Sequence, residues 1–355
     1  MYFQFTEDQR GFQDSVRKFL ANECTPVHIR ASWTTETGRS PELWSKLAEM
    51  GLFSLLVPEE HGGLGSSEVD LVLLLEETGR AALPEPVVET AAIGVPLIAG
   101  LQRKALAEAW LPKVAGGEAI LTVGHEVNPF VTDAHVADLL LLQRGNEIHA
   151  VPRDQVTLEH QPCNDPSRRL YRVEWTPSAA TRVARGEEGR SLLAAALDRG
   201  ALACAAQQLG IAQQMVDMAG RYACEREQFG KPIGSFQAIK HMLANVVVRI
   251  EFARTMVYRA AFSVAENAVT RAVDVSQAKL AACEAAVSGA KTAQQVHGAI
   301  GYTWEQDLQI WMKRAWALDI AWGTGAWHRA RLAATVLDGD VLPETFSVRR
   351  EASPA

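Results

Sequence analysis

The residues best suited to chemistry lie in one stretch near the middle of the chain. It places Arg226, Gln228, Phe229 and Phe236 around a short run of glycine and proline. A guanidinium donates paired hydrogen bonds to phosphate, and aromatic rings pack against flat ring systems. If a helix starts at Ser235, its free N–H groups also favour an anion. The spacing is typical of a site for a ligand with a phosphate and a ring. The alternative is a plain helix corner whose two phenylalanines plug the core.

Long helical patterns flank this stretch. Gly230, Pro232 and Gly234 end the first helix and delay the second, and we expect Ser235 to cap the second helix. Periodic apolar residues with short connections are typical of a four-helix bundle. The last of its helices is expected to be interrupted at 323–325. The predicted bundle helices cover residues 191–225, 236–268, 273–296 and 305–337.

The segment before the bundle changes character twice. Its first part is predicted to be helical over residues 6–20, 40–47, 67–79, 90–106 and 107–114. Short runs bounded by turn residues then predict strands over residues 119–123, 139–142, 148–151, 156–158 and 171–175. The sequence therefore predicts a mainly α protein with a small β-domain. The expected domains are an N-terminal helical domain (1–116), the β-domain (117–186), the bundle (187–340) and a polar tail (341–355).

Composition excludes several kinds of function. The chain has 355 residues and a net charge of −7, which argues against a nucleic-acid binder, because such proteins need a clustered basic face. Five scattered cysteines form no metal-ligand spacing, so no metal site is expected. No apolar run approaches the length of a membrane span, and the first four residues do not begin a signal peptide. We therefore expect a cytoplasmic protein that does not bind membranes.

Three motifs in a fixed order resemble those of the acyl-CoA dehydrogenase family. Residues 226–232 with Phe236 and Gln237 resemble its Arg-x-Gln-Phe-Gly-x-Pro…Phe-Gln flavin signature. Residues 295–302 resemble its Gln-x-x-Gly-Gly-x-Gly loop, and residues 57–65 resemble its Val-Pro-Glu-Glu-x-Gly-Gly loop, which makes the latter structural. The resemblance covers essentially the whole chain. It implies a helical domain, a β-barrel-like domain and a four-helix bundle in that order.

The resemblance also implies a cofactor and partners. Family members bind FAD across a subunit interface, act on acyl-CoA thioesters and pass electrons to an electron-transfer flavoprotein. In this chain, the residues that it implies for contact with FAD are Arg226, Gln228, Phe229, Phe236, Gln237, Gln295, Gly298, Gly301 and Thr324. The first three would hold the pyrophosphate and adenosine end of a flavin whose ring lies mainly in a neighbouring subunit.

The sequence departs from the family where the chemistry is done. The family removes a proton α to the thioester carbonyl with a glutamate, usually just before a Gly-Thr pair, and this chain has Trp322 there. An indole nitrogen only donates hydrogen bonds, so it cannot be a base. The alternative family position falls on Gly200. Residues 122–130 also lack the family's Thr-Glu-x-x-x-Gly-Ser-Asp flavin loop, and Ala299 replaces a loop glycine.

The missing base and flavin loop, together with the retained flavin signature, suggest a role. We predict the FAD-completing, non-catalytic subunit of a heteromeric (α2β2) acyl-CoA dehydrogenase, resembling the pairs that act on steroid side-chain CoA thioesters. The catalytic glutamate would belong to the second subunit. One alternative is a self-sufficient enzyme with Asp319 or Asp198 as a relocated base; another is a non-enzymatic scaffold. His61 and His297 are interpreted as ordinary loop histidines.

Overall fold

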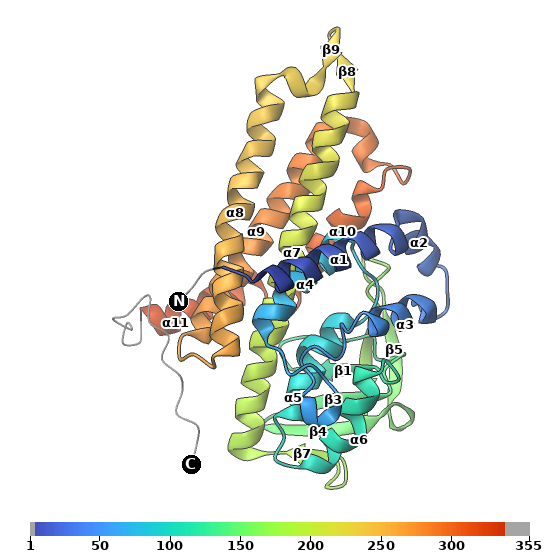
Figure 1. Cartoon of the computed structure of the whole chain (residues 1–355), viewed down its shortest axis with the longest axis vertical. Coiled ribbons are helices and arrows are strands. Elements are labelled where there is room, and N and C mark those ends of the chain that lie inside the picture. The colour runs from blue at the N-terminus through green and yellow to red at the C-terminus, as the bar shows by residue number, and fades with distance from the viewer. Residues whose placement is uncertain (1–3, 338–355) are drawn as a thin grey trace. The chain divides into compact units, whose positions relative to one another are not determined.

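The computed structural model describes residues 4–337 and is mostly helical with a small β region (Figure 1). It divides into two compact units. Unit 1 contains the described residues up to Pro26, the segment Val72–Leu83 and the residues from Cys204 onward. Unit 2 contains Val27–Leu71 and Pro84–Ala203. The predicted tail, 341–355, lies outside the described residues.

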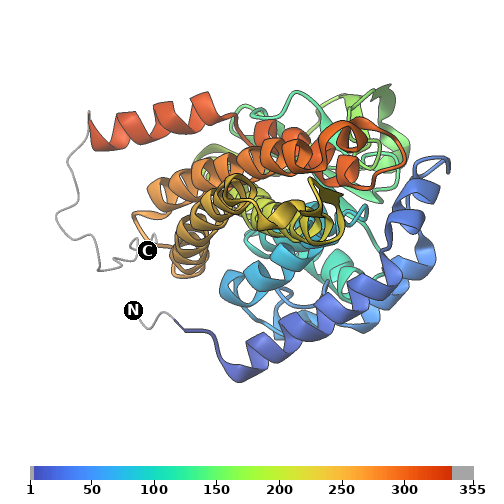
Figure 2. The same ribbon diagram turned by 90° about the horizontal axis from the view of Figure 1, so that it is seen from above.

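Unit 1 is helical and is built around α9. Small buried side chains follow this helix, among them Ala282, Ala286 and Ala290, so that α8, α10 and α11 all pack against it. Figures 1 and 2 show α8 and α9 running side by side. Two further helices, α4 (Glu68–Arg80) and α7 (Gly186–Glu225), have residues in both units. The other elements of unit 1 are α1 (Glu7–Glu23), β8 (Glu227–Gln228), β9 (Lys231–Pro232), η4 (Ile233–Ser235), α8 (Gln237–Ala265), α9 (Arg271–His297), η5 (Gly298–Tyr302), α10 (Leu308–Ile320) and α11 (Gly325–Val336).

Helices α4 and α7 cross at two glycines. A Cβ atom on Gly79 would lie 2.1 Å from the Gln207 carbonyl oxygen, and one on Gly210 would lie 1.9 Å from the Glu76 carbonyl oxygen. Real Cβ atoms never approach a backbone oxygen so closely, so only glycine permits this crossing. The two backbones are therefore in direct contact.

Unit 2 combines short helices with two sheets. One sheet has the strand order β1-β3-β4-β7, with β1 parallel to β3, and the other has the order β2-β6-β5 and is antiparallel. Leu140, Leu142, Val151 and Val156 form the centre of the apolar core of this region. The elements are α2 (Pro26–Ser32), α3 (Pro41–Glu49), η1 (Glu59–His61), the π-helix η2 (Val88–Gly94), α5 (Val95–Ala99), α6 (Lys104–Ala115), β1 (Leu121–Gly124), β2 (Val131–Thr132), β3 (Leu139–Arg144), β4 (Glu147–Pro152), η3 (Arg153–Gln155), β5 (Thr157–Gln161), β6 (Leu170–Glu174) and β7 (Arg182–Ala184).

The fold class predicted from the sequence is confirmed, with several corrections. The β-domain is not barrel-like, because its strands form two separate sheets. The helix expected over 90–106 is wrong: a π-helical stretch and a short α-helix end at Ala99, and the next helix begins at Lys104. The fourth bundle helix is two helices, α10 and α11, with the break at the expected place. Helix α2 and strands β2 and β7 were missed, because seven-, two- and three-residue elements carry almost no periodicity.

Candidate functional site

The stretch that carries the flavin signature forms a tight hairpin at one end of unit 1. Strands β8 and β9 pair Gln228 with Lys231, which leaves Phe229 and Gly230 as the two turn residues (Figure 1). Both have positive φ, 55° and 77°, as tight two-residue hairpin turns require. This conformation costs a phenylalanine about 1–2 kcal/mol. The turn holds the Phe229 ring out, and the residue is 92% exposed.

The exposed Phe229 contradicts the alternative in which both phenylalanines plug the core. Its ring instead meets Phe236 edge-on, with 6.1 Å between the ring centroids. The Lys231 ammonium lies 4.4 Å from the centre of the Phe236 ring and covers it. The hairpin tip is therefore a small aromatic and cationic surface that points away from the core.

The first turn of α8 is open beside this tip. The expected cap at Ser235 is wrong: this residue ends η4, and α8 begins at Gln237 with Phe236 in the capping position and no side-chain cap bond. Free N–H groups at a helix start favour an anion. Arg226 lies exposed at the start of the hairpin, and within residues 4–337 its guanidinium has no hydrogen bond or ion pair. The amide nitrogen of Gln228 donates to the Glu227 carbonyl, 2.8 Å away.

A ring stack brings the second motif to the first. His297 ends α9, and its ring stacks on Tyr222 of α7 with 4.5 Å between centroids and 22° between planes. Its Nδ1 donates to the Ala293 carbonyl at 2.7 Å, and burial lowers its pKa. A neutral, stacked and hydrogen-bonded imidazole fits the interpretation of His297 as an ordinary histidine. The stack fixes the end of α9 against the last turns of α7.

The two glycines of the second motif are required for different structural reasons. Gly298 has φ 64° and ψ −141°, a backbone conformation almost restricted to glycine, and a side chain here would meet open space. Gly301 is needed by the chain itself, because its Cβ would lie 3.1 Å from Cβ of His297 and 3.2 Å from the Gln294 carbonyl oxygen. Only Gly298 therefore leaves room for the backbone to approach another group. Gln295 is exposed, as is Gln237 at the start of α8.

The loop between α10 and α11 carries two further residues that the sequence singled out, Trp322 and Thr324. Trp322 is only 2% exposed and has φ 55°, and Gly323 follows with φ 98°. Thr324 is the N-cap residue of α11, and its hydroxyl oxygen accepts the Trp327 N–H at 3.2 Å. The side chain at the position where the resemblance implies the base is thus a buried indole.

Two buried basic side chains hold this loop. The Lys279 ammonium donates to the carbonyl oxygens of Leu318 (2.8 Å) and Asp319 (3.1 Å), the last carbonyls of α10, where a cation suits the helix dipole. His328 donates from Nε2 to the Trp322 carbonyl at 3.0 Å and accepts the Ser276 hydroxyl at Nδ1, also at 3.0 Å. Burial lowers the pKa of His328 to about 4, so the ring is neutral at pH 7. The loop is therefore fixed on both sides of Trp322.

Comparison with known proteins identifies the family. Residues 187–337 match the model of the acyl-CoA dehydrogenase C-terminal domain, and residues 6–118 match that of the N-terminal domain. The chain belongs to the acyl-CoA dehydrogenase family. It is 34% identical over 312 residues to the acyl-CoA dehydrogenase IpdE2 of Mycolicibacterium smegmatis, covering 87% of this chain and 93% of that one.

Two solved structures of similar fold come from paired proteins. The ChsE4-ChsE5 complex of Mycobacterium tuberculosis matches with a TM-score of 0.86 at 26% identity, over 96% of this chain and all of the other. The steroid acyl-CoA dehydrogenase Tcur3481-Tcur3483 matches with a TM-score of 0.85 at 25% identity, over 94% and 98%. The chain is thus a relative of flavoprotein oxidoreductases that act on CH–CH bonds, including steroid-degrading members.

Neither candidate base of this acyl-CoA dehydrogenase chain belongs to the hairpin segment. Asp198 is buried in the part of α7 that belongs to unit 2. Asp319 is half-buried near the end of α10 and lines a hollow together with Lys279 and Cys283. Gly200, the alternative base position, lies buried within α7. No helix within residues 4–337 is long and apolar enough to cross a membrane.

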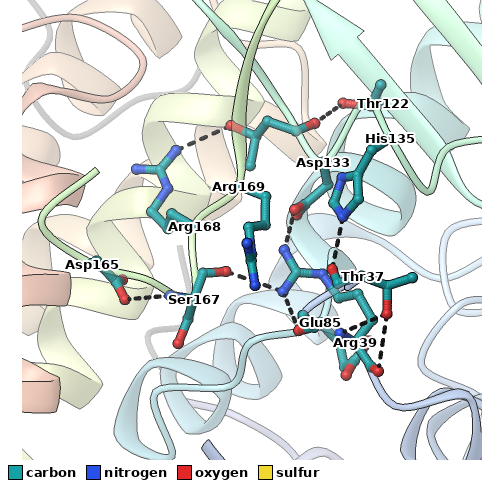
Figure 3. Close-up of polar contacts among 12 residues, drawn as sticks. Thr37, Arg39, Glu85, Thr122, Asp133, His135, Asp165, Ser167, Arg168 and Arg169 are labelled. Carbon is teal, nitrogen blue, oxygen red and sulfur yellow. Dashed lines mark hydrogen bonds and ion pairs between the residues drawn. The ribbon is translucent and has the colours of Figure 1, made fainter. Parts of the chain in front are cut away.

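Sequence reasoning missed a polar network in unit 2. Arg39 and Asp133 form a buried ion pair, and Arg39 also donates to the carbonyl oxygens of Gly38 (2.8 Å) and Ser167 (3.1 Å) (Figure 3). His135 is hydrogen-bonded to the Thr37 carbonyl at 2.7 Å. The paired residues are about a hundred positions apart, so no local spacing could reveal them.

Two carboxyl groups in this network have raised pKa values. Burial raises the pKa of Glu85 to about 7, although its Oε1 accepts the Ser40 N–H at 2.9 Å. Burial, and then the charge of Asp133, raise the pKa of Glu89, which lies in the π-helix. Perturbed acids occur both in functional sites and in structural networks. Here the bonds join residues 37–40 to 133–135 and 167, so the network braces unit 2.

Proposed function

We propose that this chain is the FAD-completing, non-catalytic subunit of a heteromeric acyl-CoA dehydrogenase. The partner would carry the glutamate base and most of the flavin-ring site. The substrate would be a CoA thioester with a bulky acyl group of the steroid side-chain class. When bound, FAD supplies the hydride acceptor for α,β-dehydrogenation.

The observation that carries the proposal is the buried indole of Trp322. It occupies the position of the family's base, it cannot accept a proton, and Lys279 and His328 hold its loop. A small movement of the loop would therefore not bring a base into place. This end of the chain fits a role in which the proton is removed by a residue of another subunit.

The hairpin end of unit 1 supports the other half of the proposal. Arg226 has no partner among residues 4–337, the first turn of α8 lacks a side-chain cap, and Gly298 is open to close approach. These groups suit the pyrophosphate and adenosine end of FAD, with Arg226 donating to the pyrophosphate. Phe229 would pack against the cofactor. Gln228, Phe236, Gln237, Gln295, Gly301 and Thr324 remain the other proposed contact or supporting residues.

The relatives agree with a paired assembly. The similar solved structures include the ChsE4-ChsE5 complex and the paired steroid acyl-CoA dehydrogenase Tcur3481-Tcur3483. An electron-transfer flavoprotein is the proposed electron acceptor, by resemblance to the family.

The test is Arg226→Ala in the complex formed with an acyl-CoA dehydrogenase chain encoded nearby. Loss of charge-assisted bonds to pyrophosphate should weaken FAD binding by about ten- to a hundredfold, measured by flavin fluorescence on dilution. Arg221→Ala, an exposed arginine near the same end of α7, is the control and should leave binding unchanged. Unchanged flavin affinity for Arg226→Ala would favour a scaffold instead.

A further inference from the structure

A second hollow of unit 1 lies among α1, α4, α7 and α10. Its volume is about 310 Å³, and residues of these four helices line it together with Thr25, Pro26 and Asp307. Every lining residue belongs to unit 1, so one compact body forms the hollow. None of the residues proposed to contact FAD lines it. Small-ligand pockets begin at about this size, so the hollow is large enough for a small organic molecule.

Part of the lining is apolar and firmly held. Leu20, Met218 and Trp311 contribute to it, and Leu20 and Trp311 are almost completely buried. The indole N–H of Trp311 donates to the Arg80 carbonyl at 2.8 Å, which fixes the orientation of the ring. An indole ring and a thioether both pack well against an alkyl chain or another ring. This part of the hollow therefore suits the hydrocarbon portion of a ligand.

Arg17 and Arg80 also line the hollow, and the chain itself balances their charges. Arg17 forms an ion pair with Glu77 at 2.7 Å, and Arg80 forms one with Asp217 at 2.5 Å. Glu77 is buried, so the first of these pairs is partly shielded from water. The two arginines therefore offer little net attraction to a ligand that carries several negative charges.

Arg221 is the cation of the lining that has no such balance. It is exposed, and within residues 4–337 its guanidinium has no hydrogen bond or ion pair. Asp307 lines the hollow too, but it is the N-cap residue of α10, where the positive end of the helix dipole offsets its charge. One unbalanced guanidinium together with an apolar wall suits a ligand with a single negative charge and an apolar body.

We propose that this hollow binds a small apolar carboxylate, with the carboxylate on Arg221 and the hydrocarbon portion on Leu20, Met218 and Trp311. A phosphate-bearing ligand fits less well, because Arg17 and Arg80 already have carboxylate partners. A neutral hydrocarbon would leave Arg221 unpaired. The site does not depend on the proposed FAD role, because the two share no residue.

The test is the binding of octanoate to the full-length protein in its native assembly, measured by isothermal titration calorimetry. Octanoate should bind at one site per chain, and Arg221→Ala should weaken this binding about tenfold or more, because charge-assisted hydrogen bonds are lost. 1-Octanol keeps the apolar body without the charge, so it should bind the native chain and Arg221→Ala with similar affinity. Arg103→Ala removes an exposed arginine of unit 2 and should bind octanoate as the native chain does.

A second variant tests the hollow itself. Ala21 lines it from α1 and is exposed, so Ala21→Trp should fill the space and abolish octanoate binding while the chain stays folded. Ala180→Trp makes the same change at an exposed turn of unit 2 and should leave binding unchanged. Octanoate binding that survives Ala21→Trp overturns the proposal. So does equal octanoate affinity of the native chain and Arg221→Ala, or a native chain that binds no octanoate.

Discussion

His328 should make unfolding depend on pH in a way that reports the Trp322 loop. Its ring is buried, donates to the Trp322 carbonyl and accepts the Ser276 hydroxyl, and its pKa is lowered to about 4 from an ordinary value of 6.5. Protonation would put a hydrogen on Nδ1, remove its acceptor and bury a charge. The folded state therefore takes up this proton less readily than the unfolded state does.

Proton linkage gives the sign and the size of this change in the unfolding free energy. Because the folded pKa is depressed, the stabilising contribution is complete above pH 6.5 and is lost as the pH falls from 6.5 to about 4. One pKa unit corresponds to about 1.36 kcal/mol, so the full loss is about 3 kcal/mol. Urea unfolding of the native chain and of His328→Gln should be compared at intervals from pH 7.5 to pH 4.5.

The difference between the two proteins isolates His328 from all other titrating groups. The advantage of the native chain at pH 7.5 should shrink steadily below pH 6.5. His241→Gln, which removes an exposed histidine of α8, is the matched control for the loss of one histidine. An advantage that stays constant down to pH 4.5 would refute the reasoning that a neutral His328 holds this loop.

Three further predictions test particular contacts. Gly210→Ala should lower the unfolding free energy by about 2 kcal/mol or more in urea unfolding, because its Cβ would lie 1.9 Å from the Glu76 carbonyl oxygen. Gly220→Ala on the same helix should be neutral or slightly stabilising, because its Cβ would have nothing within 4 Å. The unfolding free energy of Glu85→Gln should rise relative to that of the native chain as the pH rises from 4.5 to 8, because the folded pKa of about 7 makes ionisation of Glu85 in the folded state unfavourable. A difference independent of pH in the same assay would contradict this. Asp319→Asn should leave steady-state turnover of the assembled enzyme within a few-fold of native, and a loss of about a hundredfold or more would identify it as the base.

Long and strongly periodic elements were predictable from the sequence. The buried alanines of α9 and the apolar stripe of α1 repeat at helical spacing over many turns, which fixes element type without any tertiary information. Short elements were not: β2 and β7 pair with strands far away in the chain, so long-range pairing decides their conformation. The barrel-like β-domain that the resemblance implied was wrong, because the strands form two separate sheets and local sequence patterns do not fix which strand edges meet.

The candidate site was predictable in part. Motif spacing located the hairpin and the end of α9, but the Tyr222–His297 stack that joins them depends on packing. Ser235 failed as a cap because it is the last residue of η4, so that α8 starts at Gln237, one residue later than expected. The roles of Lys279 and His328 were invisible, since each acts through backbone carbonyls on another element.

Flavin stoichiometry is the sharpest test of whether this chain completes the FAD site of another subunit. The chain should be co-expressed with the acyl-CoA dehydrogenase chain encoded nearby, and the purified assembly measured by native mass and flavin absorbance. We expect one FAD per pair of unlike chains and no acyl-CoA oxidation by this chain alone. One FAD per chain, or an active flavoprotein made of this chain alone, would contradict it.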